Sequence, residues 1–374
     1  SSSSAATLAQ ERRMFSALVG GRHLDVGRAM MGWQQHTNLH SCFAFAFVLA
    51  LATGLVFEVL NKKLMEIVRC KPWCSQAMQL QKSLAMNFGY QEKDCTEEAM
   101  LDAYCFVLLF CFHHFLAGCA LLPVVIMGWE ASGFTGQLLF VLGVLSDVAL
   151  DLFDSVKIFM RTFLHNHIPW GPPCPLAFFI ILCCLHHPLA IGMVIPLVVH
   201  QPEMRSFHLI ATALLLAAGI CFLTGAYKFT LDVKSKRGFM QYKGIVLLQL
   251  VTILFTRGYI WFTQAYVTLS TFRSEGKTNF FIAGCVAASL MSLFNLVMIM
   301  DSIDAAKKWL PRPTPTGAEE GEEVEQEMVR QLSTQMNVPR YLTDVLSPEA
   351  RRFRASATVL VAASKFKKGI PKRD

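Results

Sequence analysis

Charged residues are scarce in this chain. They make up 16% of its 374 residues, whereas hydrophobic residues make up 53% and the mean hydropathy is +0.42. A soluble domain averages about 25% charged residues, so the composition argues against one. Runs of about 18 or more apolar residues with few charges are typical of transmembrane helices. We predict an all-α polytopic membrane protein with seven transmembrane helices, at 42–60, 104–128, 137–160, 176–199, 207–227, 244–268 and 280–301.

Three further absences narrow the functional class. The net charge of +7 comes without a patch of interleaved basic and aromatic residues, so nucleic acid is not a predicted partner. The last apolar run, 280–301, contains no lysine and cannot form the Schiff base of a retinal protein. No repeat or interrupted helix is evident, which leaves an ion channel or transporter as the least favoured function.

Patterns of metal ligands are absent from the apolar runs as well. None contains Glu-x-x-His or His-x-x-x-His, so no metal site is predicted. Most of the twelve cysteines lie in apolar runs, where a free thiol behaves as a small hydrophobic side chain. Cys70, Cys74 and Cys95 share one polar loop, and two of them could form a disulfide if that loop faced an oxidising compartment.

Changes in composition divide the chain into five parts. These are an N-terminal arm (1–41), the first transmembrane helix (42–60), a polar loop (61–103), a membrane domain of six closely spaced helices (104–310) and a charged cytoplasmic tail (311–374). The arm is either a disordered extension or the remnant of a targeting peptide. The tail carries six glutamates in 319–327 and eight basic residues in 350–374, so anionic lipid or a protein partner is its predicted contact.

The distribution of Lys and Arg between the loops predicts the orientation of the chain, because these residues are retained on the cytoplasmic side. One side of the predicted membrane carries seven of them and the other side carries twelve. The larger set is Lys62, Lys63, Arg69, Lys71, Lys82, Lys93, Arg161, Lys228, Lys234, Lys236, Arg237 and Lys243. We therefore expect the N-terminus outside and the tail in the cytoplasm or an equivalent organellar compartment.

Ionisable residues inside apolar runs carry most of the functional information, because they must face protein or water. Asp147, Asp151 and Asp154 recur at i, i+4 and i+7, which places three carboxylates on one helix face. We expect this row to face the bundle interior, with Asp147 protonated or paired with a histidine. Asp154 and Lys157 have a second interpretation, as residues that mark the cytoplasmic headgroup zone.

Two pairs of adjacent histidines and one arginine occupy other apolar runs. His186 and His187 precede Pro188, and His113 and His114 lie in an earlier run. Adjacent helical residues diverge by about 100°, so one histidine of each pair should face the bundle while the other finds a different neighbour. Arg257 lies about midway along the sixth run, and we expect it to pair with the aspartate row.

Five short motifs, taken in order, resemble the TLC domain (the TRAM–Lag–CLN type), a six-helix membrane unit. The closest likeness is to the small TLC-domain-containing proteins, and a more distant one is to ceramide synthases. The similarity covers roughly 100–310 and rests on "HHFLAG" (His113, Gly118), "GVLSD" (Gly143, Asp147), "LHHPLAIGMVIPL" (His186, His187), "LFTR" (Phe255, Arg257) and "LFNLVMIMDSIDAAKKW" (Asn295). The "LFTR" spacing is one residue short of the family pattern.

This resemblance implies a lipid-handling membrane protein, in the endoplasmic reticulum or, alternatively, a mitochondrial or plastid membrane. In a catalytic version it would be an acyl-CoA-dependent acyltransferase without a cofactor. His186 or His187 would act as base or acyl acceptor, and Asp147 would orient the imidazole. The other polar residues predicted to bind the lipid are His113, His114, Asp151, Arg257 and Asn295.

Two departures from the family pattern support a different function. The fifth apolar run has Ala218 and Gly219 where the family carries a glutamate and small polar residues, and no longer histidine–aspartate motif follows His187. A non-catalytic structural subunit of a larger membrane complex, with contacts made by the tail, is therefore the alternative function.

Overall fold

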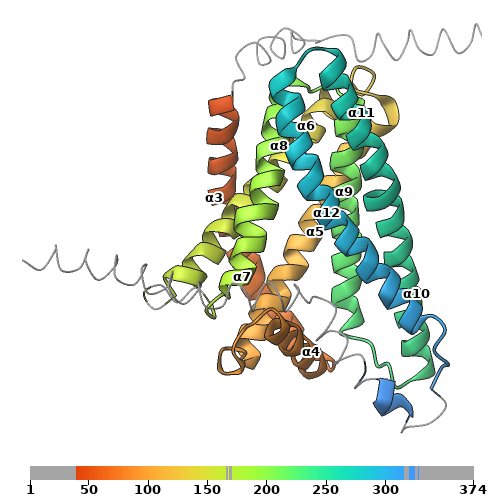
Figure 1. Cartoon of the computed structure of the whole chain (residues 1–374). Coiled ribbons are helices and arrows are strands. Elements are labelled where there is room, and N and C mark those ends of the chain that lie inside the picture. Colours follow the sequence, from red (N-terminus) through yellow and green to blue (C-terminus); the bar gives the residue numbers. More distant parts are fainter. Residues whose placement is uncertain (1–38, 166, 168–170, 316–319, 325–326, 328–374) are drawn as a thin grey trace, which may run out of the picture.

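The computed structural model describes residues 39–165, 167, 171–315, 320–324 and 327. Within them the chain forms a bundle of helices and no strand (Figure 1). Seven segments are long and apolar enough to cross a membrane: α3 (Leu39–Arg69), α5 (Glu97–Met127), α6 (Gly133–Phe163), the continuous segment Leu176–His200, α9 (Arg205–Lys228), the continuous segment Lys236–Ser274, and α12 (Thr278–Trp309). The seven predicted transmembrane helices are confirmed, and the chain is an integral multi-pass membrane protein.

The outside of the bundle is apolar along these helices. Leu55 of α3 is 72% exposed, Ile126 of α5 is 75% exposed and Leu293 of α12 is 63% exposed. Large hydrophobic side chains on so much of the surface are unfavourable in water and match the hydrocarbon of a bilayer.

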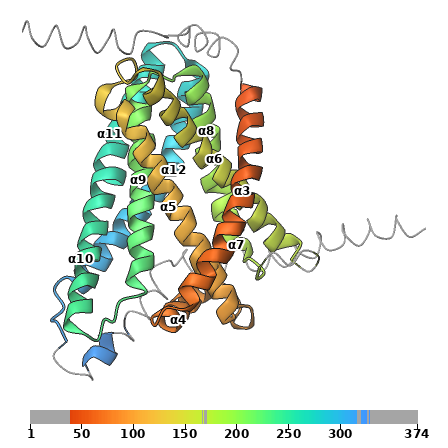
Figure 2. The same cartoon turned by 180° about the vertical axis from the view of Figure 1, so that it is seen from behind.

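The helix α6 is the most enclosed of the seven segments. Of the residues in its most apolar stretch 61% are buried, against 11% to 33% in the other six. In Figures 1 and 2, α3 stands at one edge of the bundle, α10 (Lys236–Ile253) and α11 (Trp261–Ser274) form the opposite edge, and α12 crosses the bundle obliquely. The aspartate row of α6 therefore lies on the one segment that protein surrounds most completely.

Two clusters of buried hydrophobic residues lie towards opposite ends of the bundle. One contains Tyr104, Phe239 and Trp309, and the other contains Phe140 and Phe207. Along α5, His113 and His114 lie between the residues of the two clusters, whereas on α6 the second cluster extends from Phe140 to Val148 and so surrounds Asp147.

The second half of the bundle contains two π-helical segments. The segment η3 (Ile180–His186) joins α7 (Leu176–Phe179) to α8 (His187–His200), and η4 (Leu254–Ile260) joins α10 to α11. Pro188 lacks an N–H and cannot donate to the carbonyl four residues earlier, which accounts for the altered hydrogen bonding around His186. Such π segments occur often at functional sites, and these two carry His186 and Arg257.

The loop before α7 is fastened to the end of α6. The Arg161 Nε donates to the Pro172 carbonyl oxygen at 2.9 Å, and the Cys174 N–H donates to the Arg161 carbonyl oxygen at 3.1 Å. The Arg161 Nη2 also donates to the Tyr90 hydroxyl at 3.4 Å. Burial raises the pKa of the Tyr90 phenol, so this hydroxyl stays neutral. These contacts hold the α7–η3–α8 segment beside α6.

The loops with the larger set of basic residues lie together at one end of the bundle. That end also carries α4 (Cys74–Asn87) and the short helix η2 (Glu92–Asp94) (Figure 1). Which side of the membrane this basic end faces stays a prediction. All twelve cysteines are free thiols in this structure, Cys70, Cys74 and Cys95 included. The N-terminal arm up to residue 38 and most of the tail lie outside the described residues.

The helices α5 and α9 approach each other closely at Gly219. A methyl group on Gly219 would lie 2.6 Å from the backbone nitrogen of Phe115. Small residues permit such close packing between membrane helices. We therefore expect Gly219→Ala to force the two helices apart and to lower the free energy of unfolding by about 1–3 kcal/mol, measured on purified protein in detergent.

Gly192 of α8 provides the matched control for this substitution. Apart from its chain neighbours and its own helix backbone, no heavy atom of the described residues lies within 4 Å of a methyl group placed on it. We expect Gly192→Ala to leave the free energy of unfolding unchanged or slightly higher, because alanine favours the helix. Equal losses in the two variants would show that the α5–α9 contact has no special importance.

Candidate functional site

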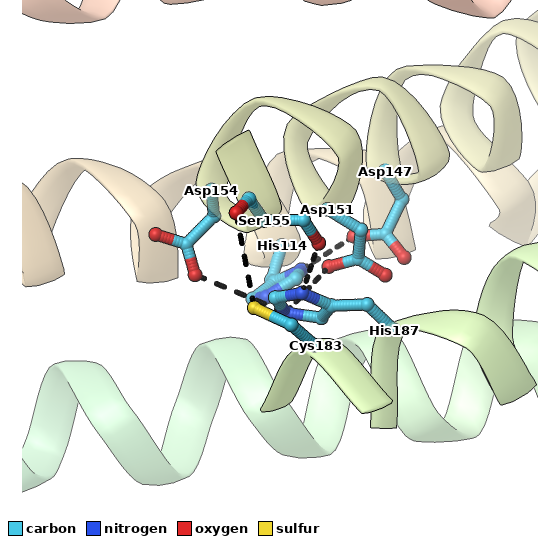
Figure 3. Close-up of polar contacts among 7 residues, drawn as sticks. All are labelled: His114, Asp147, Asp151, Asp154, Ser155, Cys183 and His187. Atoms are coloured by element: carbon cyan, nitrogen blue, oxygen red, sulfur yellow. Dashed lines mark hydrogen bonds and ion pairs between the residues drawn. The ribbon is translucent and has the colours of Figure 1, made fainter. Parts of the chain in front are cut away.

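The aspartate row of α6 faces histidines from two other helices, as Figure 3 shows. Asp147, Asp151 and Asp154 lie on one face of α6, as their spacing predicts. His114 reaches this face from α5, and His187 reaches it from α8. The expectation that the row faces the bundle interior and meets histidines is confirmed.

Asp147 forms an ion-pair contact with His114. The distance from Asp147 Oδ1 to His114 Nδ1 is 2.6 Å, and the two side chains are only 16% and 11% exposed. The His114 ring also packs edge-on against Phe110, with ring centroids 4.6 Å apart. The pairing of Asp147 with a histidine is thus confirmed, and the partner comes from the earlier histidine pair.

His187 lies between a hydroxyl group and two carboxylates. Its Nδ1 is 2.7 Å from Ser155 Oγ, and its Nε2 is 3.6 Å from Asp151 Oδ1 and 3.8 Å from Asp154 Oδ2. The His187 side chain is 3% exposed. In this geometry the carboxylates placed to orient His187 are those of Asp151 and Asp154, and not that of Asp147. It also gives Asp154 a partner other than lipid headgroups.

Two residues of this site were not predicted, Ser155 and Cys183. The Cys183 thiol donates to the Ser155 carbonyl oxygen at 3.8 Å. Both residues could have been found by extending the helical spacing, since Ser155 follows Asp151 by four residues and Cys183 precedes His187 by four. Serine and cysteine are common in membrane helices, however, and nothing else in the sequence distinguishes these two.

The second histidine of each pair turns to a different neighbour. His186 stacks on Phe294 of α12, with ring centroids 5.3 Å apart. His113 packs edge-on against Phe57 of α3, with centroids 6.0 Å apart. The buried His186 Nδ1 and His113 Nε2 have no hydrogen-bond partner among the described residues. The predicted divergence within each pair is confirmed.

The prediction that Arg257 pairs with the aspartate row is wrong. The Arg257 Nη1 donates to Asn295 Oδ1 at 2.7 Å, and its guanidinium carbon lies 5.5 Å from the centroid of the Phe294 ring. No carboxylate of the described residues forms an ion pair with it. The reason is placement: η4 packs against α12, whereas the α6 carboxylates already face His114 and His187. Arg257 and Asn295 thus form a second polar pair.

Lys157, the other residue with a headgroup interpretation, has its partner inside the bundle. Its Nζ is 2.8 Å from Glu58 Oε1 of α3 and lies 4.1 Å from the centroid of the Phe106 ring. The side chain is 4% exposed. Lys157 is therefore a buried charge that joins α3 to α6.

The site combines a hydroxyl group, an imidazole and carboxylates in one chain of contacts. An imidazole within hydrogen-bond distance of a hydroxyl group, with a carboxylate on its far side, is an arrangement that activates a nucleophile. No group of three or more His, Cys, Asp or Glu side chains in the described part of the chain has a geometry that could hold a metal ion. Side chains placed in this way can hold and move a proton between the hydroxyl and the imidazole.

Comparisons with models of protein families, with curated proteins and with solved structures gave no match to this chain.

Proposed function

We propose that this chain is a lipid-handling membrane protein of TLC type that transfers an acyl group from a thioester to a lipid, with His187 as the general base. The observation that carries the proposal is the 2.7 Å contact between His187 Nδ1 and the Ser155 hydroxyl, with two carboxylates near Nε2. A general base must lie within hydrogen-bond distance of the proton that it removes. His187 meets this condition within the bundle.

The depth of the site favours an amphipathic substrate. Asp147 lies near the middle of α6 (Gly133–Phe163), and Ser155 is eight residues farther, or about 12 Å towards the basic end. Half of the hydrocarbon core is about 15 Å thick, so Ser155 lies close to the boundary between acyl chains and headgroups. A thioester with its acyl chain in the bilayer and its polar carrier at the surface fits this depth.

The basic end of the bundle supports the same class of substrate. Long-chain acyl thioesters of coenzyme A carry phosphate groups, and these would meet the Lys and Arg side chains of the loops at that end. Membrane lipids are the proposed acceptors. The endoplasmic reticulum is the membrane that the TLC resemblance implies, and microscopy of tagged protein tests that part of the proposal.

The experiment uses purified full-length protein in phosphatidylcholine nanodiscs with labelled palmitoyl-CoA and a total lipid extract. We expect labelled product from the natural sequence and a rate at least about a hundredfold lower from His187→Gln, because general-base catalysis contributes at least that factor. His200→Gln, at the exposed end of the same helix, is the control and should keep the full rate.

Two outcomes would contradict the proposal. The first is no labelled product from the natural sequence with any fraction of the lipid extract. The second is a His187→Gln rate equal to that of His200→Gln. In either case the cluster would be a structural part of the bundle, as expected for a non-catalytic subunit.

A further inference from the structure

We propose that Ser155 is the nucleophile that carries the acyl group as a covalent ester between the two halves of the transfer. This inference rests on the proposed function and assigns the acyl acceptor within the protein. It gives His187 the role of base only, whereas a histidine that accepts the acyl group itself would need no hydroxyl beside it.

Many hydroxyl groups in these helices bond to their own backbone, whereas the Ser155 hydroxyl contacts a histidine side chain. Thr162 donates to the Ile158 carbonyl at 2.9 Å, and Ser302 donates to the Met298 carbonyl at 2.9 Å, each bonding to its own helix backbone. The Ser155 hydroxyl has His187 Nδ1 as its partner and makes no such backbone bond among the described residues. Serine in a helix often bonds to the preceding turn. Ser155, like Ser206 and Ser292, has a side-chain partner instead, and its partner is an imidazole, whereas theirs are a hydroxyl and an indole.

The carboxylates on the far side of His187 fix the direction of proton transfer. Asp151 and Asp154 both face Nε2, which favours the tautomer that carries its proton there. Nδ1 then presents its lone pair to the Ser155 hydroxyl, which donates. The same carboxylates stabilise the imidazolium ion that forms once His187 has accepted the proton.

The Ser155 side chain is less enclosed than that of its partner His187. Ser155 is only half-buried, and the neighbouring Val156 is 49% exposed on the outside of the bundle. An acyl chain that lies along this face can bring its carbonyl carbon to Ser155 without entering the packed core. His187, at 3% exposure, stays shielded behind it.

The reaction balances without an oxidant or a reductant. Ser155 Oγ attacks the thioester carbonyl carbon while its proton passes to His187 Nδ1, and the carbon–sulfur bond breaks. The sulfur leaves as a thiol with that proton. An acceptor hydroxyl or amine then gives its proton to Nδ1 and attacks the ester carbonyl carbon. The Ser155 oxygen leaves and regains the proton, so thioester and acceptor become ester or amide and thiol.

Cys183 is the competing nucleophile nearest to the site. Its thiol donates to the Ser155 carbonyl oxygen at 3.8 Å, whereas His187 contacts the serine hydroxyl. A thiol is a good nucleophile only as a thiolate, and no basic group of the described residues forms a contact that would take its proton. The geometry therefore favours Ser155.

The test maps the adduct on the natural sequence. Full-length protein in phosphatidylcholine nanodiscs is treated with palmitoyl-CoA without an acceptor, digested and analysed by tandem mass spectrometry. We expect palmitate on the peptide that contains Ser155, in a bond stable to neutral hydroxylamine, as an oxygen ester is. A serine-directed fluorophosphonate probe should label the same residue, and prior treatment with palmitoyl-CoA should block that labelling.

Variants separate this inference from the proposed function. We expect Ser155→Ala to lose the adduct and at least tenfold of the transfer rate, and Ser155→Cys to move the adduct into a hydroxylamine-sensitive thioester. Ser146→Ala is the matched control, because its hydroxyl bonds to the Gly143 carbonyl of its own helix. Palmitate on His186, His187 or Cys183, or full transfer by Ser155→Ala, would overturn the role of Ser155 while acyl transfer stands. Absence of both adduct and transfer in the natural sequence would overturn both proposals.

Discussion

Replacing both Asp151 and Asp154 with asparagine is expected to lower the proposed acyl transfer by about a thousandfold or more, measured as kcat/KM for palmitoyl-CoA in nanodiscs. Asparagine keeps the shape of each side chain and removes its charge. The imidazolium of His187 then forms without a nearby anion, and the tautomer with a free Nδ1 is no longer favoured. The base therefore stays in place but works poorly.

Each single substitution should have a much smaller effect, because Oδ1 of Asp151 and Oδ2 of Asp154 lie at similar distances from Nε2, 3.6 and 3.8 Å. One remaining carboxylate can still stabilise the imidazolium. The double variant should thus lose more than the product of the two single losses, which is the signature of residues that share one role. Additive losses, or a full loss from one residue alone, would contradict this shared role.

Unfolding cannot explain the expected loss. The two carboxylates are 4% and 14% exposed, and removing charge from the membrane interior lowers the cost of burying these side chains. The double variant should therefore remain folded, which its elution profile and circular dichroism would check. Asp304→Asn, at a side chain that is 73% exposed, is the control and should keep the full rate.

The features that were predictable from the sequence are those that depend on one helix at a time. The length of the apolar runs predicted the seven transmembrane helices. The spacing of Asp147, Asp151 and Asp154 predicted that they share one helix face. Adjacent residues of a helix diverge by about 100°, so the side chains of His186 and His187 had to point in different directions. The high cost of a charge in hydrocarbon then required the aspartate row to face inwards.

The pairings between helices were not predictable in the same way. Arg257 was expected to meet a carboxylate because opposite charges attract, but the choice of partner depends on which helices are neighbours. Packing of η4 against α12 brought Asn295 to Arg257 instead. Hydropathy carries no information on such neighbours, and the π-helical turn at Arg257 changes which way the side chain points.

Ser155 illustrates a different limit. Its spacing from Asp151 places it on the face of the aspartate row, yet a serine in a membrane helix is usually satisfied by its own backbone. Only the position of His187 across the bundle shows that this hydroxyl contacts an imidazole. The sequence therefore predicts which face is polar, and the fold shows which residue on that face contacts a histidine.

Glu58→Gln is expected to lower the free energy of unfolding by about 3–5 kcal/mol, because it leaves the Lys157 charge buried without its partner. The Lys157 side chain is 4% exposed, and its Nζ lies 2.8 Å from Glu58 Oε1. The remaining contact of Nζ, with the Phe106 ring at 4.1 Å, is a cation–π interaction worth about 2 kcal/mol at most. That contact cannot replace the carboxylate. Denaturant titration in detergent micelles measures the loss.

A second substitution distinguishes the buried charge from the lost contact. Replacing Lys157 with methionine in the Glu58→Gln variant removes the unpaired charge and keeps the volume, so most of the lost stability should return. Glu98→Gln is the matched control, because it breaks a pair with Arg69 in which both side chains are more than half exposed, and such pairs contribute at most about 1 kcal/mol. Should Lys157 instead extend to the headgroups when Glu58 is neutralised, Glu58→Gln would cost no more than Glu98→Gln. The link between α3 and α6 would then rest on apolar packing alone.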